Sequence, residues 1–132
     1  MELAGAKLRI ARPTSDMAAA KRFYMNGLGL ELLGSFEDHG GFDGITLGFA
    51  SQSFHLEITY EHAAPEISPP SPEDLIVFYV EDKAAWQRIV DRMKSLGYEA
   101  VKSSNSYWDV TGITFADPDG FRVVLENAAS GI

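Results

Sequence analysis

The 132-residue sequence is 45% hydrophobic and 23% charged, as expected of one soluble globular domain that is large enough for a core. It contains no cysteine, which excludes disulfides, thiolate zinc sites and cysteine nucleophiles. A formal net charge of −8, without a cluster of lysines and arginines, argues against nucleic-acid binding. No signal-peptide pattern is present, and no apolar run approaches the roughly 20 residues that span a bilayer, so we expect a cytoplasmic protein without membrane contact.

The first half of the chain predicts the order β-α-β-β-β. A short strand ends at Pro13, and Asp16 offers a cap for the helix that follows. This helix has apolar residues on one face and is predicted to end at Gly27 and Gly29. Residues 37–44 are polar and glycine-rich, which predicts a loop. The predicted elements are a strand at 8–12, a helix at 17–26, and strands at 31–36, 45–49 and 54–60.

The strand at 54–60 alternates strictly between apolar and polar residues, which is the period of a strand with one face in a core. One face would carry Phe54, Leu56 and Ile58, and the other His55, Glu57 and Thr59. An imidazole and a carboxylate on one strand face are costly to bury and useful in a cavity.

The second half repeats the same order at an offset of about 66 residues, which indicates a duplicated module. Residues 61–73 contain four prolines and no periodic pattern, so they are predicted to be an extended linker. A single domain over 1–132 would then hold one module at 8–60 and another at 74–127. The second module has predicted strands at 75–80, 99–102, 112–116 and 121–127, an amphipathic helix ended by Gly97, a polar loop at 103–110 and a tight turn at 117–120.

Two motifs resemble the vicinal oxygen chelate superfamily, which includes glyoxalase I, bleomycin-resistance proteins, extradiol dioxygenases and fosfomycin-resistance enzymes. They are Phe-Tyr-x3-Leu-Gly-Leu at 23–30 and Asp-Pro-Asp-Gly-Phe at 117–121. The resemblance implies an α+β fold in which two βαβββ modules form a curled, cup-shaped mixed sheet with helices outside and the ligand inside. It also implies a homodimer, and it directs His55, Glu57 and Thr59 into the cup.

Metal-dependent members of this superfamily supply one ligand from each of four strands. The corresponding positions in this sequence are Arg9, Glu57, Leu75 and Val124. Only Glu57 has a side chain that can bind a metal, since arginine is a permanent cation and the other two have no donor atom. We therefore expect no metal and no other cofactor. A shifted site built from His55, Glu57 and Glu126 is a less favoured alternative, because Arg9 would repel the ion.

Several residues are candidates for ligand binding. We hypothesise that Arg9 occupies the place of the metal and pairs with Glu57, either as a vestigial pair or as an anion-holding group. His55 is either part of the cavity wall or an acid–base group. Glu126 is expected on the cup side of its strand.

Aromatic residues form a second group of candidates. Tyr79 is expected on the apolar wall of the cup, with its hydroxyl group as a polar handle. Tyr107 and Trp108 lie in the predicted polar loop, where they would form a lid, a protein contact or a small hydrophobic cluster. His39 is expected to be solvated, with a lid residue as the alternative.

The sequence thus predicts a glyoxalase-like protein that binds a small organic molecule, aromatic or cationic, without a metal. The alternatives are a lyase or isomerase that uses His55 or Glu57, and a scaffold whose cup is filled by side chains. The chain has no nucleophile elbow, phosphate-binding loop or zinc-protease helix.

Overall fold

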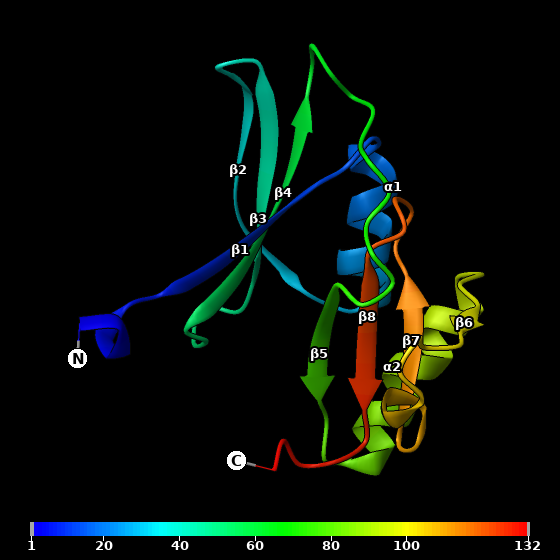
Figure 1. Cartoon of the computed structure of the whole chain (residues 1–132). Helices are drawn as coiled ribbons and strands as arrows, with labels where there is room; N and C mark the ends of the chain where they lie inside the picture. The colour runs from blue at the N-terminus through cyan, green and yellow to red at the C-terminus, as the bar shows by residue number, and fades with distance from the viewer. Residues whose placement is uncertain (1, 132) are drawn as a thin grey trace. The chain divides into compact units, whose positions relative to one another are not determined.

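The computed structural model describes residues 2–131 and divides into two compact units between Ile67 and Ser68 (Figure 1). Each unit contains one four-stranded mixed sheet and has the order β-α-β-β-β. The predicted α+β fold with two βαβββ modules is therefore confirmed. None of the helices among residues 2–131 is both long and apolar enough to cross a membrane.

The first unit has the strand order β1-β4-β3-β2, in which β1 runs parallel to β4 and the other pairs are antiparallel. Asp16 caps its helix, since its carboxylate accepts a hydrogen bond from the Ala19 backbone N–H at 3.1 Å. The elements are a 3-10 helix at Glu2–Gly5, β1 at Leu8–Pro13, α1 at Met17–Lys21 with a π-helical continuation at Arg22–Gly27, β2 at Glu31–His39, β3 at Phe42–Gly48 and β4 at Phe54–Glu61.

The core of this unit lies between the helical segment and one face of the sheet. Phe23 and Tyr24 are buried there, together with Leu47, Leu56 and Ile58. The alternate residues of β4 lie on the opposite face and are half-buried, as the alternation predicted. We call this opposite face, which carries His55, Glu57 and Thr59, the polar face of the first sheet.

One sequence prediction for the first unit is wrong. Residues 37–44 are not a loop, because β2 continues to His39, β3 begins at Phe42, and only Gly40 and Gly41 turn between them. Both glycines have positive φ angles, 60° and 85°, which a two-residue hairpin turn requires. Gly29, with φ 82°, is the left-handed residue after the helix, whereas Gly27 still belongs to the π-helical turn.

The second unit has the strand order β5-β8-β7-β6, with β5 parallel to β8. Its helix packs against β8 (Figure 1). The Trp86 indole N–H donates to the Leu125 carbonyl of this strand at 2.8 Å. Asp82 caps the start of the helix, and Gly97, with φ 93°, follows its end. The elements are β5 at Leu75–Tyr79, α2 at Lys83–Ser95, β6 at Ala100–Val101, a 3-10 helix at Ser106–Asp109, β7 at Gly112–Ala116 and β8 at Arg122–Glu126.

The loop predicted at 103–110 is only partly irregular, because four of its residues form the 3-10 helix Ser106–Asp109. The second predicted strand of the module, at 99–102, shrinks to Ala100–Val101. Residues 62–74, between the two sheets, form neither helix nor strand.

Candidate functional site

The polar face of the first sheet carries an ion pair. Nη1 of Arg9 lies 3.1 Å from Oε2 of Glu57, so the predicted pairing of these residues is present. The Arg9 side chain is 54% exposed and that of Glu57 is 19% exposed. A partly exposed pair contributes about 0–1 kcal/mol to stability. Such a pair can therefore rearrange towards a ligand at little cost.

His55 lies beside this pair. It is the register partner of Arg9 on β1 and of Gly48 on β3, and residues opposite one another point to the same face. Gly48 has no side chain to cover the imidazole, and a Cβ atom at this glycine would lie 3.6 Å from Cδ2 of His55. The Cδ1 atom of Leu33 lies at the same distance from that point. The structure thus brings a cation, a carboxylate and an imidazole together on one open face.

The donor atoms of the chain do not fit the four-ligand metal shell of the superfamily. Leu75 and Val124 offer no donor, and the guanidinium group of Arg9 already lies against Glu57. Within residues 2–131 there is no group of three or more His, Asp or Glu side chains arranged to hold a metal ion. We therefore derive no chemical step through a metal.

A pocket of about 310 Å³ lies in the second unit. This volume lies at the lower end of the roughly 300–1,000 Å³ that is typical of small-molecule sites. Its wall combines two apolar strand residues and an indole with hydroxyl, amide and carboxylate groups, and it contains no basic side chain. The lining residues are Pro72, Glu73, Leu75, Val77, Ser103, Ser104, Asn105 and Trp108.

Trp108 belongs to this pocket, whereas its neighbour Tyr107 is 64% exposed. The two rings pack edge to face with centroids 5.2 Å apart. Two polar contacts fix the segment: the Asn105 side chain accepts from the Tyr107 N–H at 3.0 Å, and the Asp109 carboxylate accepts from the Ser103 N–H at 3.2 Å. Of the two predicted loop aromatics, only Trp108 therefore lines the cavity.

Glu126 and Tyr79 lie outside the lining of the pocket, although they are on the same sheet face as Val77. Tyr79 is the register partner of Glu126 and is 39% exposed. Glu126 is 4% exposed, and its Oε1 accepts a hydrogen bond from the Thr111 hydroxyl at 2.9 Å. Its Oε2 is buried and has no hydrogen-bond partner among the described residues 2–131. We call the face that carries Val77, Tyr79 and Glu126 the pocket face of the second sheet.

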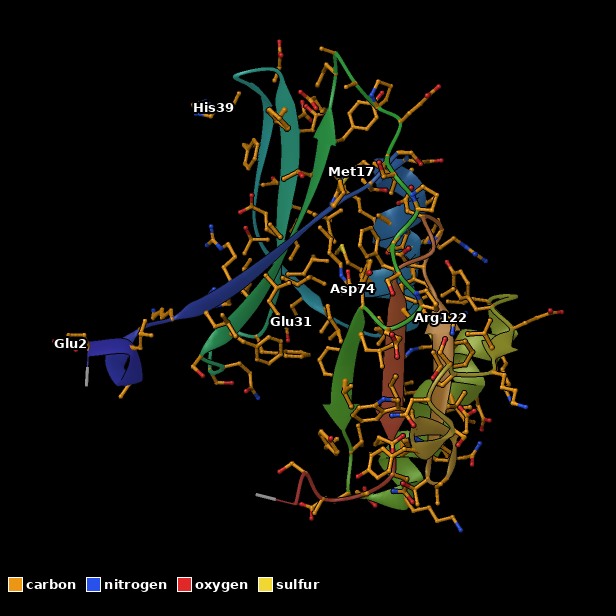
Figure 2. All side chains as sticks on the ribbon, viewed as in Figure 1. Glu2, Met17, Glu31, His39, Asp74 and Arg122 are labelled. Carbon is orange, nitrogen blue, oxygen red and sulfur yellow. The ribbon has the colours of Figure 1, made fainter. Side chains whose placement is uncertain are left out.

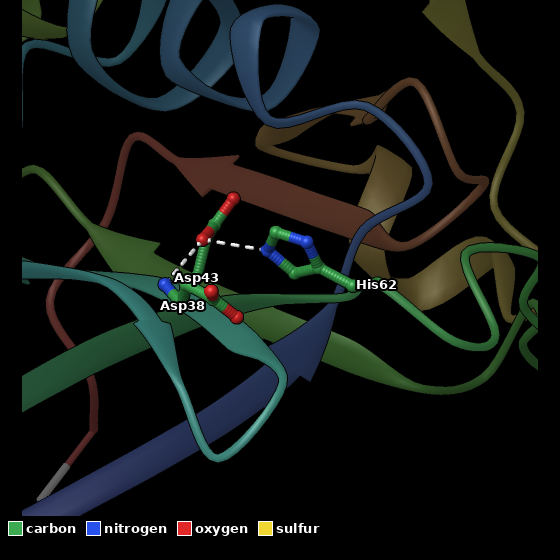
Figure 3. A network of polar contacts seen from close by, with 3 residues as sticks. All are labelled: Asp38, Asp43 and His62. Carbon is green, nitrogen blue, oxygen red and sulfur yellow. Dashed lines mark hydrogen bonds and ion pairs between the residues drawn. The ribbon is translucent and has the colours of Figure 1, made fainter.

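A polar network at the hairpin end of the first sheet was not predicted. The Asp43 carboxylate accepts a hydrogen bond from the Asp38 backbone N–H at 2.8 Å and lies 2.8 Å from Nε2 of His62. Figure 3 shows these three residues together. The Asp38 hydrogen bond, followed by that of His62, lowers the pKa of Asp43. The hydrogen bond to Asp43 raises the pKa of His62. His39 is exposed at the tip of the same hairpin, as predicted (Figure 2).

Sequence reasoning also missed most of the pocket. Pro72 and Glu73 fell in the predicted linker, and Ser103, Ser104 and Asn105 were ordinary loop residues. The available signal was the large aromatic Trp108 in a polar loop, which indicated a cavity but not which residues would share it.

Comparison with known proteins identifies the family. Residues 8–59 match the YycE-like N-terminal domain, and residues 73–127 match the YycE-like C-terminal domain. Protein YycE of Bacillus subtilis (strain 168) is 40% identical over 123 residues, which cover 93% of this chain and 88% of that protein. The chain belongs to the YycE-like family.

Solved structures of similar proteins agree with this assignment. A crystal structure of a YycE protein from Bacillus subtilis has a TM-score of 0.88 at 40% identity, covering 96% of this chain and 94% of that one. The trypanothione-dependent glyoxalase I of Leishmania major has a TM-score of 0.72 at 21% identity, covering 92% and 85%. TnmS3, an antibiotic-binding protein from Streptomyces sp. CB03234, has a TM-score of 0.67 at 20% identity, covering 96% and 97%. The YycE-like family thus has the fold of the vicinal oxygen chelate superfamily, as the sequence motifs predicted.

Proposed function

We propose that this YycE-like protein binds a small organic molecule in the pocket beside Trp108, and that binding requires no metal ion. The observation that carries the proposal is the pocket itself, about 310 Å³ in volume, with an indole, two aliphatic side chains and a few polar groups in its wall. Such a wall suits a flat apolar ring that carries one or two polar substituents. The lack of basic lining residues disfavours an anionic ligand.

The antibiotic-binding protein TnmS3 supports this choice by analogy, because it has the same fold and is described by what it binds. The metal-free part of the proposal rests on the donor atoms. Of the four positions that hold a metal elsewhere in the superfamily, one carries a guanidinium group and two carry aliphatic side chains.

The two tryptophans of the chain allow a direct test. In Trp86→Phe the remaining indole lies in the pocket, whereas in Trp108→Phe it lies on α2 and is bonded to the Leu125 carbonyl. We expect 4-nitrobenzyl alcohol, a contact quencher of indole fluorescence, to quench Trp86→Phe saturably and Trp108→Phe only in proportion to its concentration. Equal saturable quenching of both variants, or none in either, would contradict the proposal.

A second candidate is acid–base catalysis, for which the polar face of the first sheet is the relevant observation. His55 lies beside Arg9 and Glu57, so an imidazole and an anion-binding group are available to one substrate. A metal-free screen for lyase and isomerase turnover tests this candidate. Turnover that is lost in His55→Asn but retained in His39→Asn would favour it.

We also propose that the protein is a homodimer. Leu8 on β1 and Leu32 on β2 support this, since they are 58% and 46% exposed on the two edge strands of the first sheet. Sedimentation velocity would then give a single species of twice the 14.5 kDa chain mass, whereas a species of 14.5 kDa at micromolar concentration would refute the dimer.

A further inference from the structure

Glu126 is a buried carboxylate that forms no ion pair within residues 2–131. Only 4% of the surface of Glu126 is exposed. Within residues 2–131 its carboxylate accepts one hydrogen bond, from the Thr111 hydroxyl. The second carboxylate oxygen has neither solvent nor a hydrogen-bond donor. A buried polar atom that lacks a partner destabilises the folded state, so an arrangement of this kind calls for an explanation.

The surrounding backbone leaves room for this carboxylate. Gly112 is its register partner on β7, and a Cβ atom there would collide with Oε2 of Glu126 and with the Trp108 carbonyl oxygen. The free oxygen therefore lies against the backbone of the residue whose indole lines the pocket. Trp108 thus lies beside both, with its indole in the pocket wall and its carbonyl group near Glu126.

The sheet register fixes the distance between the pocket wall and Glu126. Val77, in the pocket wall, is the partner of Val124 on β8, and the next residue on the same face of β8 is Glu126. Residues two apart on a strand are about 7 Å apart and neighbouring strands about 5 Å apart, so the backbone positions of Val77 and Glu126 are about 8 Å apart. A group carried on a short arm from a ring in the pocket could span this distance.

Access for a ligand requires a shift of the segment Ser106–Asp109, because the carbonyl group of Trp108 lies beside the carboxylate. This segment is a single 3-10 turn, held by the Asn105 side chain, by the Asp109 carboxylate and, beyond its end, by the bond from the Asn127 N–H to the Thr111 carbonyl at 2.9 Å. Tyr107 and Val110 are 64% and 78% exposed, so they contribute little burial that would resist a shift.

We propose that Glu126 is the specificity-determining residue of this pocket, and that the ligand carries a protonated nitrogen, such as an amine or amidine, that bonds to its free oxygen. This inference rests on the proposed function and adds the chemical class of the ligand. The aromatic part of the ligand lies against Leu75 and Val77, and the nitrogen reaches Oε2 as the 106–109 turn, which carries Trp108, shifts. A charge-assisted hydrogen bond to a buried carboxylate is worth about one to two orders of magnitude in affinity.

The test compares two probes of matched shape, 4-nitrobenzylamine and 4-nitrobenzyl alcohol, by calorimetry at pH 7. We expect the amine to bind wild-type protein at least about tenfold more tightly than the alcohol. In Glu126→Gln this preference disappears, because the amine loses its charge-assisted bond and its affinity falls to about that of the alcohol. Glu73→Gln is the matched control, because Glu73 is the carboxylate in the pocket wall. It should retain most of the preference.

Each other outcome overturns the inference. Equal binding of the two probes to wild-type protein refutes the ligand class but leaves the proposed function intact. A preference that survives Glu126→Gln and disappears in Glu73→Gln assigns recognition to Glu73 instead. If neither probe binds, the proposed function fails and this inference fails with it. Thermal unfolding by circular dichroism shows whether each variant is folded.

Discussion

Replacement of Glu126 by glutamine should stabilise the protein, although the site would lose its charge. In the native chain, one carboxylate oxygen accepts from Thr111 and the other is buried without a donor. A glutamine of nearly the same shape keeps an oxygen for Thr111. Its amide NH2 group takes the place of the unpaired oxygen, beside the carbonyl of Trp108.

The expected gain in the free energy of unfolding follows from the replacement of the unpaired carboxylate oxygen by an amide NH2 group. An unpaired buried acceptor costs about 1–3 kcal/mol, and a new neutral hydrogen bond contributes about 1 kcal/mol. Since the amide geometry will be imperfect, we expect the free energy of unfolding to rise by about 1–2 kcal/mol. For a chain of this length, that corresponds to an increase in Tm of roughly 3–8 °C.

Urea denaturation followed by circular dichroism and by tryptophan fluorescence measures this change. Glu57→Gln is the matched control, because it makes the same chemical substitution at a carboxylate that is partly exposed and paired with Arg9. The control should lose at most about 1 kcal/mol. If Glu126→Gln is less stable than the wild type, the carboxylate has a stabilising partner, and the reasoning about Glu126 is refuted.

Two further predictions concern other parts of the chain. The pKa of His62 should lie above its usual 6.5 and that of Asp43 below its usual 3.8. The pair therefore stabilises the folded protein most between pH 3.8 and pH 6.5. This stabilisation is lost as the pH rises through the raised pKa of His62, and also as the pH falls through the lowered pKa of Asp43. An NMR titration should show the His62 pKa falling in Asp43→Asn, and an unchanged pKa would contradict the contact. Gly112→Ala should destabilise the protein by about 1–3 kcal/mol in urea denaturation, because the added Cβ would collide with Glu126. Gly34→Ala is the control and should not destabilise the protein, since nothing lies within 4 Å of a Cβ atom there. Equal effects of the two substitutions would refute this prediction.

The parts of the fold that depend on local periodicity were predictable from the sequence. The alternation in β4 separated Leu56 and Ile58, which are buried, from His55 and Glu57 on the opposite face. The proximity of Arg9 to Glu57, 48 residues apart, needed the strand order that the superfamily resemblance supplied. The alternation of residues in β4 and the strand order of the superfamily were together sufficient to predict the polar face of the first sheet.

Contacts that depend on strand register were not predictable. The 37–44 region looks like a loop in the sequence, because the pairing of two polar strands across Gly40 and Gly41 leaves no apolar alternation to detect. The Asp43–His62 bond follows from that same hairpin. The burial of Glu126 depends on how the 106–111 segment folds back over β8, and spacing along the sequence does not report this.

The central claim, that the pocket beside Trp108 binds an organic ligand without a metal, is tested most directly by calorimetry with chelator-treated protein. We predict that 4-nitrobenzyl alcohol binds this protein with one site per chain, and that its affinity is unchanged when Zn²⁺ or Mn²⁺ is added. Binding that appears only after one of these ions is added, and that is lost again in Glu57→Ala, would contradict the account.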